Sequence, residues 1–458
     1  MISSIQTGRP CAVAILAAGQ GTRMRSDRAK VLHPIGGAPM LHHAMRAAMA
    51  LEPQRVAVVV GHGGDAVAEA ARALLPDVAI CSQDQQMGTG HAVRMAAPAL
   101  EGFGGDLMIL FGDTPFLTAE TLQAVAAARG NADLVVLGFE AADPGGYGRL
   151  VTDDAGGLLR IVEAKDATAD ELTIRLCNSG IMAGDCATLL SLLEQVGNDN
   201  AKGEFYLTDA IGLGRDRGLT ATVVRCGEAE TLGINDRAQL AEAEATFQAR
   251  ARHAALMSGV TMTAPETVFL AWDTQLGRDV TIEPNVFFGP GVTVADGAWI
   301  RAYSHLEGCH VGPGAAIGPF ARLRPGAELA EGAKIGNFVE MKNATLGPGA
   351  KANHLSYLGD TAVGAGANIG AGTITCNYDG FGKYPTQIGD RAFVGTNTAI
   401  VAPVTIGAGA YVGTGTVVTR DVPEDALAIA RTEQTNHDGM AKRLRAKLRA
   451  RAGKTDKE

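Results

Sequence analysis

Apolar side chains recur in steps of six through the C-terminal half of the chain, from about residue 276 to residue 422, with a one-residue slip at Val311 and wider gaps after Met341. Neither the helical repeat of 3.6 residues nor the strict alternation of a half-buried strand gives a step of six. A coil of three short, flat strands does, because every sixth side chain then points inward and stacks on the coil below. The pattern therefore predicts a parallel β-helix of hexapeptide repeats. Its predicted inward positions are Leu276, Ile282, Phe288, Val294, Ile300, Leu306, Val311, Ile317, Leu323, Leu329, Ile335, Met341, Leu358, Ile369, Ile388, Val394, Ile400, Ile406, Val412 and Val418.

The first half of the chain instead alternates short apolar runs with alanine-rich helical patterns. Strands that alternate with helices indicate βαβ units, and hence a Rossmann-like α/β domain with a mostly parallel sheet covered on both faces. Ligands of such sheets lie beyond the carboxyl ends of the strands. The predicted strands are Cys11–Ala17, Arg55–Val60, Ala79–Cys81, Leu107–Phe111 and Leu134–Phe139, and the predicted helices are Met40–Ala50, Asp65–Leu75, His91–Ala99 and Ala119–Ala128.

These patterns divide the chain into four parts. We expect an α/β domain over residues 1–227, a helical linker over 228–264, the β-helix over 265–440 and a basic tail over 441–458. The linker contains a predicted helix from Asp236, as its N-cap, to Met257, with Gly259 ending it. This helix could hold the two domains apart as a stiff arm, or it could pack along one of them. The tail is expected to be a solvated or frayed helix.

Composition narrows the classes of function. A formal net charge of −9 over 458 residues gives no indication of a nucleic-acid or membrane-surface partner. The seven cysteines are scattered and include no CxxC pair, which favours free thiols in a reducing compartment over disulfides or zinc. We find neither a leader sequence nor an apolar run approaching ~20 residues, so we expect a soluble, cytoplasmic protein without membrane insertion.

A glycine-rich loop follows the first predicted strand. Such a loop lets backbone N–H groups approach phosphate oxygens, although by itself it could equally be a plain tight turn. It lacks the third glycine of G-x-G-x-x-G, and no acidic ribose-binding residue is evident at the expected spacing, which argues against a dinucleotide site. Further short motifs follow it along the chain, at residues 16–24 with Lys30, 83–92, 111–113, 145–149, 161–163, 178–180 and 233–235.

Together these motifs resemble those of the sugar-nucleotide pyrophosphorylases. The resemblance implies that a sugar-1-phosphate attacks the α-phosphorus of UTP and pyrophosphate leaves, a reaction dominated by positioning and charge neutralisation. Asp113 could instead be an ordinary cap of the helix that follows Thr118. The implied nucleotide-site residues are Leu16, Ala17, Ala18, Gly19, Gly88, Phe111 and Gly112, with Arg23 and Lys30 on the phosphates, Gln83 and Thr89 on the uracil, Asp113 and Asn235 on Mg²⁺, and Gly148, Glu163 and Asn178 on the N-acetylhexosamine.

Charged and polar motifs also decorate the β-helix. Arg324 and Lys342 are one coil apart, so both cations should lie in adjacent coils on one edge, where they suit a sugar phosphate or are simply solvated. His354 can accept a proton at neutral pH. Zinc is the competing use of histidine, but His305 and His310 lack a third histidine at a matching position. Residues 381–387 interrupt the ladder and should protrude as a loop.

From about residue 11 to residue 431, the chain resembles the bacterial family of bifunctional N-acetylglucosamine-1-phosphate uridylyltransferases/glucosamine-1-phosphate N-acetyltransferases. The resemblance implies left-handed coils, a homotrimer formed through the β-helix and an acetyl site shared between subunits. It makes His354 the general base that takes a proton as the amine of glucosamine-1-phosphate attacks the acetyl-CoA thioester. It assigns Arg324, Lys342, Tyr357 and Asn368 to glucosamine-1-phosphate, and Ala371, Asn377, Tyr378, Thr396, Thr414 and Arg431 to acetyl-CoA.

Two other functions remain open at this point. The first is a monofunctional pyrophosphorylase with a purely structural β-helix, against which the set of Arg324, Lys342, His354 and Tyr357 argues. The second is a non-catalytic assembly or regulatory subunit, against which the intact glycine-rich loop and Asp113 argue. The function that the resemblance implies is acetyl transfer to glucosamine-1-phosphate, followed by uridylyl transfer that yields UDP-N-acetylglucosamine.

Overall fold

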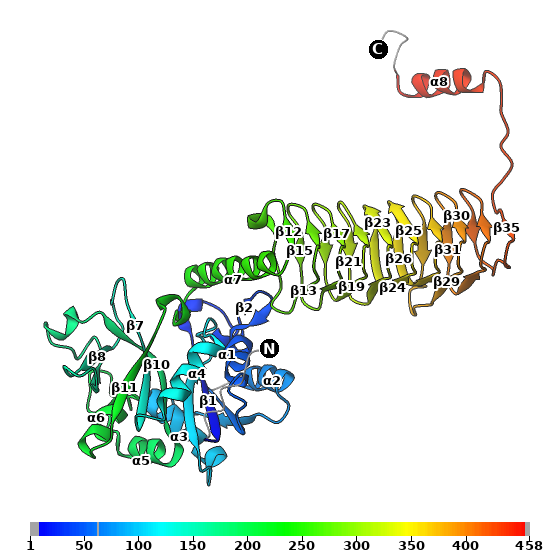
Figure 1. The fold of residues 1–458 in the computed structure, drawn as a ribbon. Helices are drawn as coiled ribbons and strands as arrows, with labels where there is room; N and C mark the ends of the chain where they lie inside the picture. The colour runs from blue at the N-terminus through cyan, green and yellow to red at the C-terminus, as the bar shows by residue number, and fades with distance from the viewer. Residues whose placement is uncertain (1–8, 62–63, 454–458) are drawn as a thin grey trace. The chain divides into compact units, whose positions relative to one another are not determined.

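The computed structural model describes residues 9–61 and 64–453, which form two compact units (Figure 1). The first unit extends to Ala254 and takes in Leu270–Trp272, and the second comprises Ala255–Phe269 and the chain from Asp273 onward. Within the described residues, none of the helices combines the length and apolarity that crossing a bilayer requires.

The first unit is built on a nine-stranded mixed sheet with the central order β11-β7-β10-β6-β1-β4-β5. Strand β1 pairs in parallel with both β4 and β6, whereas β10 runs antiparallel between β6 and β7. The strands are β1 (Cys11–Ala17), β4 (Arg55–Val60), β5 (Ala79–Ser82), β6 (Asp106–Phe111), β7 (Leu134–Glu140), β8 (Arg149–Thr152), β9 (Leu158–Val162), β10 (Leu176–Asp185) and β11 (Ala221–Cys226), with a separate hairpin of β2 (Pro34–Ile35) and β3 (Ala38–Pro39). The helices are α1 (Met40–Met49), α2 (Asp65–Leu74), α3 (Thr89–Leu100), α4 (Ala119–Ala128), α5 (Cys186–Gln195) and α6 (Asp209–Asp216).

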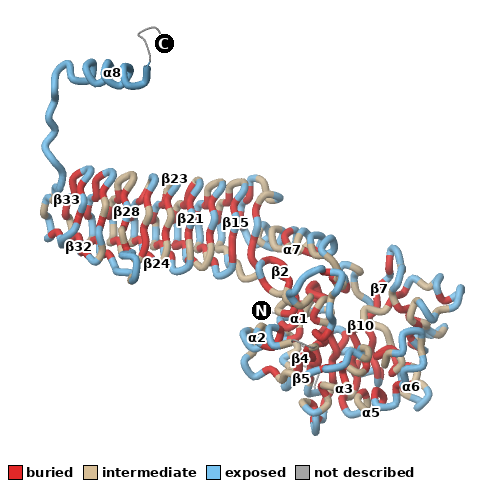
Figure 2. The backbone as a smooth tube through the Cα atoms, turned by 180° about the vertical axis from the view of Figure 1, so that it is seen from behind, coloured by how far each residue is buried: buried red, intermediate tan, exposed pale blue. Residues whose placement is uncertain are grey.

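Helices cover both faces of this sheet, as the sequence pattern predicts. Alternate residues of β1 point to opposite faces, so Ala14 packs in one apolar cluster with α3, α5 and α6, and Ile15 in another with α1, α2 and α4. The central strands are therefore buried on both sides, which is why they appear in the sequence as continuous apolar runs. Figure 2 shows this buried layer running through the unit.

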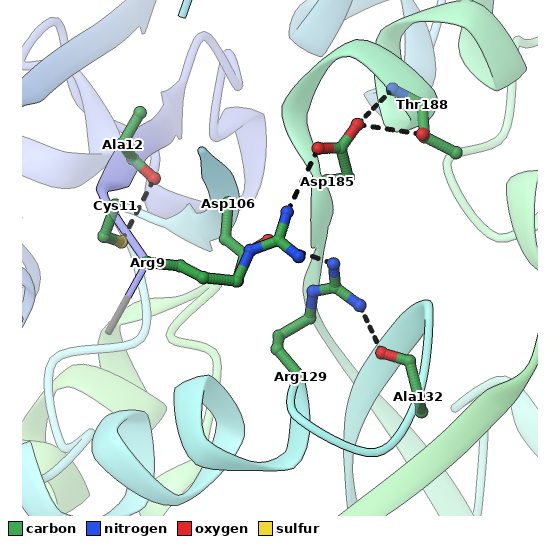
Figure 3. Close-up of polar contacts among 8 residues, drawn as sticks. All are labelled: Arg9, Cys11, Ala12, Asp106, Arg129, Ala132, Asp185 and Thr188. Atoms are coloured by element: carbon green, nitrogen blue, oxygen red, sulfur yellow. Dashed lines mark hydrogen bonds and ion pairs between the residues drawn. The ribbon is translucent and has the colours of Figure 1, made fainter. Parts of the chain in front are cut away.

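A cluster of charged side chains ties the amino ends of β1 and β6 to the carboxyl end of the antiparallel strand β10 (Figure 3). Asp106, at the start of β6, accepts from Arg129 Nη2 at 3.0 Å and lies 3.3 Å from Arg9 Nε. Arg9 also reaches Asp185 at the end of β10, and Asp185 caps α5 by accepting from the backbone N–H of Thr188 at 3.0 Å. This cluster lies at the edge of the sheet opposite the carboxyl ends of β1 and β6.

Helix α7 (Arg237–Met257) follows the last strand of the first unit. Asp236 caps it as predicted, by accepting from the N–H of Gln239 at 2.9 Å. Side chains on α7, including Phe247, pack in an apolar cluster with Ile35, Met40 and Phe116. Up to Ala254 the helix therefore belongs to the first unit, and of the two arrangements open from sequence it adopts the packed one.

The second unit is a parallel β-helix with three faces, and every strand pair in it is parallel. Face one contains β12 (Thr261–Met262), β14 (Thr281–Ile282), β17 (Trp299–Ile300), β20 (Ala316–Ile317), β23 (Lys334–Asn337), β25 (Lys351–His354), β27 (Asn368–Ile369), β30 (Phe393–Val394), β33 (Tyr411–Val412) and β35 (Leu427–Ala428). Face two contains β15 (Phe287–Phe288), β18 (His305–Leu306), β21 (Arg322–Leu323), the first part of β24 (Glu340–Leu346) and of β26 (Tyr357–Val363), β28 (Ile374–Cys376), β31 (Ala399–Val401) and β34 (Val417–Val418). Face three contains β13 (Gln275–Leu276), β16 (Thr293–Val294), β19 (Cys309–Val311), β22 (Ala327–Leu329), the second part of β24 and β26, β29 (Thr386–Ile388) and β32 (Val404–Ile406).

The side chains at the predicted inward positions are buried, except that Leu276 in the first coil is half-buried. The predicted interruption at 381–387 is placed too late, because Thr386 and Gln387 already pair with β26 in strand β29. The extra residues protrude over 377–385 instead, and Phe381 at the tip is 99% exposed. The coil resumes at Thr386, because its buried side chain points into the interior of the β-helix and its backbone pairs with Thr361 of β26.

The corner between faces one and two, which we call the first corner, departs from the usual turn chemistry. One position of this corner has a positive φ, a conformation that suits glycine and asparagine. In four successive coils, however, the position carries a bulky apolar side chain that is about half exposed. These are Tyr303, Phe320, Phe338 and Leu355, at φ 61, 55, 56 and 52°.

The described part of the basic tail contains helix α8 (Met440–Arg451), all of whose residues are exposed. This agrees with the expected solvated helix. Residues 454–458 of the tail lie outside the described residues.

Candidate active sites

The first candidate site is a cavity of about 310 Å³ at the carboxyl ends of β1 and β6. Its floor is held by a hydrogen bond from the N–H of Gly112 to Leu16 O at 2.9 Å, which continues the β1–β6 pairing past the strand. Most of the residues predicted for the nucleotide meet here, namely Leu16, Ala17, Ala18, Gly19, Lys30, Gln83, Gly88, Thr89, Phe111 and Asp113.

The opposite wall is formed where the chain enters α3. Buried Gln83 donates to Gly88 O at 3.1 Å and lies 3.0 Å from His91 Nδ1, which fixes its amide against the start of the helix. Thr89 accepts from the N–H of Leu207 at 3.1 Å. Because both polar side chains are fixed before any ligand arrives, this wall can present a preformed hydrogen-bonding edge to a flat base.

Lys30, Asp113 and Asn235 converge at one side of the cavity. The Lys30 ammonium donates to Asp113 Oδ2 and, at 3.2 Å, to Asn235 Oδ1. Asn235 reaches this place, 122 residues beyond Asp113, because the N–H of Ile234 donates to Asp113 O at 3.2 Å. The Asn235 Nδ2 group is used by Gly233 O, so its carbonyl oxygen is the atom directed at the cation.

This donor set suits a hard divalent cation. A carboxylate and an amide oxygen already share a single positive charge, that of Lys30, so both can reach one ion. Oxygen donors are those that Mg²⁺ prefers, and it usually takes only one or two protein ligands and completes its shell with water and substrate phosphate. Among the described residues no three His, Cys, Asp or Glu side chains gather as a metal site.

The residues predicted for the sugar lie on or beside three further strands, β8, β9 and β10. The N–H of Asn178 donates to Gly148 O at 2.8 Å, which joins these two positions. Glu163 lines a separate cavity of about 480 Å³ and accepts from the hydroxyl of Thr208 at 3.3 Å. Burial raises the pKa of Glu163, so its carboxyl group is held in a setting that favours the neutral form.

Some positions differ from the predicted set. Arg23 is exposed on the 3-10 turn Thr22–Met24 and does not line the cavity. Conversely, Gln86 and Glu204 line it without having been predicted, and Gln86 donates to Ala18 O. Gln86 lies within the motif at 83–92, so sequence could have suggested it. Glu204 comes from a segment without a motif, and only folding brings it to the cavity.

Three cations gather on the β-helix near the corner between faces two and three, which we call the second corner. Leu323 pairs with Met341, and this register places Arg324 and Lys342 side by side in adjacent coils, as predicted. Lys383, from the protruding loop, is the third cation. The ammonium of Lys383, and after it Arg324, lower the pKa of Lys342. Sequence analysis missed Lys383 because no periodic position predicts where a protruding loop folds back.

The same corner carries a network around Asp360. Its carboxylate accepts from the side-chain amides of Asn343 and Asn377. Tyr378 follows on the protruding loop, is 62% exposed and donates its hydroxyl to Gly380 O at 2.7 Å. Asn377 and Tyr378 are therefore anchored on the same side as the three cations.

His354 lies at the opposite edge of face two, at the end of β25 and beside the first corner. It is exposed, and its Nδ1 is 2.7 Å from Oδ1 of Asn337, its register partner on β23. Tyr357 begins β26 just beyond this corner, and Asn368 begins β27 in the next coil of face one.

Four residues predicted for acetyl-CoA form a row that continues from His354 along the first corner. Ala371 O accepts from the N–H of Asn397 at 2.7 Å, and Thr396 O accepts from Gly415 at 2.8 Å. Arg431 then donates to Thr414 O. Ala371, Thr396 and Thr414 thus occupy equivalent positions in successive coils, whereas Asn377 and Tyr378 lie across the width of β28 at the second corner.

The two histidines considered for zinc have other contacts. His305 stacks on Phe287 with ring centroids 4.7 Å apart, and His310 Nδ1 is 2.7 Å from the Thr293 hydroxyl. Burial, and then Arg322, lower the pKa of His305.

Both halves of the chain match known protein families. The MobA-like NTP transferase domain matches residues 13–170, and the bacterial transferase hexapeptide (six repeats) matches residues 385–420. Three proteins named bifunctional protein GlmU align along almost their whole length. The one from Jannaschia sp. (strain CCS1) is 56% identical over 97% of this chain and 98% of its own. Those from Ruegeria sp. (strain TM1040) and Dinoroseobacter shibae are 60% and 61% identical, each over 96% of this chain and 98% of theirs.

The chain belongs to the bifunctional GlmU family. It is a transferase that joins a nucleotidyltransferase domain to a hexapeptide-type acyltransferase domain. Because the similarity to GlmU proteins spans both units, it favours two activities over a pyrophosphorylase with a structural β-helix, and over a non-catalytic subunit.

Proposed function

We propose that this chain makes UDP-N-acetylglucosamine in two steps. The β-helix transfers the acetyl group of acetyl-CoA to glucosamine-1-phosphate, and the α/β domain then transfers uridylyl from UTP to the product with release of pyrophosphate. The observation that carries the second activity is the oriented His354 at the first corner of a β-helix whose second corner gathers Arg324, Lys342 and Lys383, since a scaffold needs neither a base nor clustered cations.

In the uridylyl step, the cavity beside β1 and β6 takes UTP. Gln83 and Thr89 meet the uracil edge. Lys30 offsets phosphate charge within the cavity, and Arg23 adds to this from the exposed turn outside it. Asp113 and Asn235 would hold Mg²⁺, which supplies further neutralisation of the phosphates when bound. The support for this assignment is that both oxygens already share one cation. Gly148, Glu163 and Asn178 hold the N-acetylhexosamine, with Thr208 positioning Glu163.

In the acetyl step, Arg324 and Lys342 bind the phosphate of glucosamine-1-phosphate, and we add Lys383 to this set. Tyr357 and Asn368 complete the sugar site. His354 removes a proton from the amine as its nitrogen attacks the thioester carbon, and the C–S bond then breaks to release coenzyme A. Ala371, Thr396, Thr414 and Arg431 line the coenzyme A groove, with Asn377 and Tyr378 beside the reacting groups.

We further propose that the active form is a homotrimer with the acetyl site shared between subunits. His354 and the coenzyme A row lie at the first corner, whereas Asn377, Tyr378 and the cations lie at the second, so a second copy is needed to bring the two corners together. The half-exposed ladder of Tyr303, Phe320 and Phe338 offers an apolar surface for this contact.

The trimer is tested by light scattering on a Phe320→Ser, Phe338→Ser double variant. We expect it to dissociate and to lose acetyl transfer, while uridylyl transfer persists. A variant that remains trimeric refutes the ladder as the contact.

The proposed site of action is the cytoplasm, which the seven unpaired cysteines of the described chain support, because free thiols persist in a reducing compartment.

The test of the whole proposal is thiol release from acetyl-CoA with glucosamine-1-phosphate in the absence of UTP. Release establishes the second active site. If a folded protein makes UDP-N-acetylglucosamine from the acetylated sugar phosphate but releases no thiol, the β-helix is only a scaffold.

A further inference from the structure

One side-chain contact beside the first corner has a chemical consequence of its own. A neutral imidazole carries its proton on one nitrogen only, so whatever bonds to one ring nitrogen decides the state of the other. The structure places Asn337 Oδ1 2.7 Å from His354 Nδ1. A carbonyl oxygen can only accept, so this contact requires the proton on Nδ1 and leaves Nε2 with a free lone pair.

The backbone around this pair is fixed on both sides. The N–H of Leu355 donates to Asn337 O at 3.1 Å, and His354 O accepts from the Ser356 hydroxyl at 2.9 Å. Phe338 and Leu355, the residues that follow the pair, both adopt a positive φ that costs a bulky side chain energy. Stacking of Phe338 on Phe320, with centroids 5.3 Å apart, helps hold this conformation.

We propose that Asn337 is a positioning residue for the acetyl transfer, which keeps His354 in the tautomer whose Nε2 can accept the proton of the substrate amine. This inference rests on the proposed acetyltransferase function. Asn337 itself touches no reacting atom. Without it, the imidazole can rotate and can carry its proton on Nε2, and in that state Nε2 cannot accept the proton of the substrate amine.

Apart from residue 337 itself, the charged surroundings of His354 stay constant in the test. On the strand of His354 and the two strands that pair with it, the other ionisable side chains are Lys334 on β23 and Lys351 on β25, and Glu340 on β24 and Tyr357 on β26 lie across the corner. Strand β27 adds only Asn368 and Ile369. A change in pH dependence on replacing Asn337 alone is therefore attributable to that residue.

The test compares thiol release by full-length Asn337→Ala and Asn337→Asp variants as a function of pH. For Asn337→Ala we expect kcat to fall about 10- to 100-fold, which is part of the ~10²–10⁴-fold that a general base contributes, with the KM for glucosamine-1-phosphate nearly unchanged. Asn337→Asp should retain most activity, since a carboxylate also accepts from Nδ1–H. Its acid limb should move to higher pH, because a negative charge stabilises the imidazolium.

The control variant is Asn353→Ala, which removes the amide next to His354 in sequence and should keep the native pH profile. Uridylyl transfer should be unchanged in all three variants and reports that the first unit is folded, while a native KM for glucosamine-1-phosphate reports that the β-helix is folded. An Asn337→Ala variant with native kcat overturns the inference, and so does an Asn337→Asp variant as inactive as Asn337→Ala, because then the amide would act as a donor. If the unmodified chain releases no thiol, the proposed acetyltransferase function itself is wrong.

Discussion

Replacing Gly88 by alanine should damage the uridylyl site selectively, through the backbone. Gly88 precedes α3 with φ 106° and ψ 175°, a region that is essentially restricted to glycine. A Cβ atom built there would be 2.7 Å from Phe205 O and 2.9 Å from Glu204 Cβ. Neither neighbour can yield easily, because the N–H of Phe205 is itself bonded to Met87 O at 2.8 Å.

Backbone strain of this kind costs about 1–3 kcal/mol. The alternative is that the segment moves by several tenths of an ångström, which displaces Gly88 O from Gln83 and so disturbs the wall of the cavity. Since a misplacement of ~1 Å can cost ~10²-fold in rate, we expect kcat/KM for UTP to fall about 10- to 100-fold. Acetyl transfer should be unaffected, because its site is in the other unit.

The assay is pyrophosphate release from UTP and N-acetylglucosamine-1-phosphate, together with urea unfolding. Gly102→Ala is the matched control, because Gly102 also has a positive φ, 70°, but a Cβ there would meet nothing within 4 Å. It should lose about 1–2 kcal/mol of stability and keep full activity. If Gly88→Ala keeps native kcat/KM, the reasoning that links this glycine to the nucleotide wall is refuted.

Four further outcomes are expected. His354→Ala should lower acetyl transfer by ~10²–10⁴-fold and spare uridylyl transfer, and a variant that still acetylates at the native rate would exclude His354 as the base. Asp113→Asn should lower uridylyl transfer, spare acetyl transfer and raise the Mg²⁺ concentration needed for the half-maximal uridylyl rate. An unchanged Mg²⁺ requirement would count against a role of Asp113 in metal binding. Asp106→Asn should destabilise the first unit by about 2–4 kcal/mol in urea unfolding, because Arg129, whose side chain is 5% exposed, would lose its carboxylate partner. Because burial raises the pKa of Glu163, its ionised form destabilises the fold, and Glu163→Gln should therefore stabilise the chain at neutral pH in urea unfolding. This gain in stability should vanish as the pH falls below the raised pKa, because the wild-type carboxyl group is then protonated.

The β-helix could be predicted from the sequence because its signal is local and repetitive. In each coil the inward-pointing side chain of every hexapeptide must be apolar, and this requirement is met at twenty positions along the chain. Neither a helix nor an ordinary sheet gives that pattern. The register follows directly, so the adjacency of Arg324 and Lys342 could also be predicted. The strand and helix bounds of the first unit are similarly local, as β1 and β4 show, since both begin and end where the apolar runs do.

Contacts made by irregular segments could not be predicted in this way. Lys383 lies on a loop outside the hexapeptide repeat, and only its return to the second corner brings it beside Lys342. The placement of the protruding loop was likewise wrong by a few residues, because strand pairing decides where the coil resumes. The packing of α7 against Ile35 and Phe116 also depends on which apolar surface the folded first unit leaves uncovered.

The sequence by itself therefore determined the two folds, the order of the motifs and the chemical types of the candidate residues, because periodicity and short motifs are properties of neighbouring residues. Only the tertiary structure decided which of those residues meet. Asn235 lies beside Asp113, although it comes 122 residues later in the chain, because the N–H of Ile234 donates to Asp113 O. Asn337 contacts His354 because one coil stacks on the next in a fixed register. Such meetings depend on sheet order, loop path and coil length together, and no single stretch of sequence contains that information.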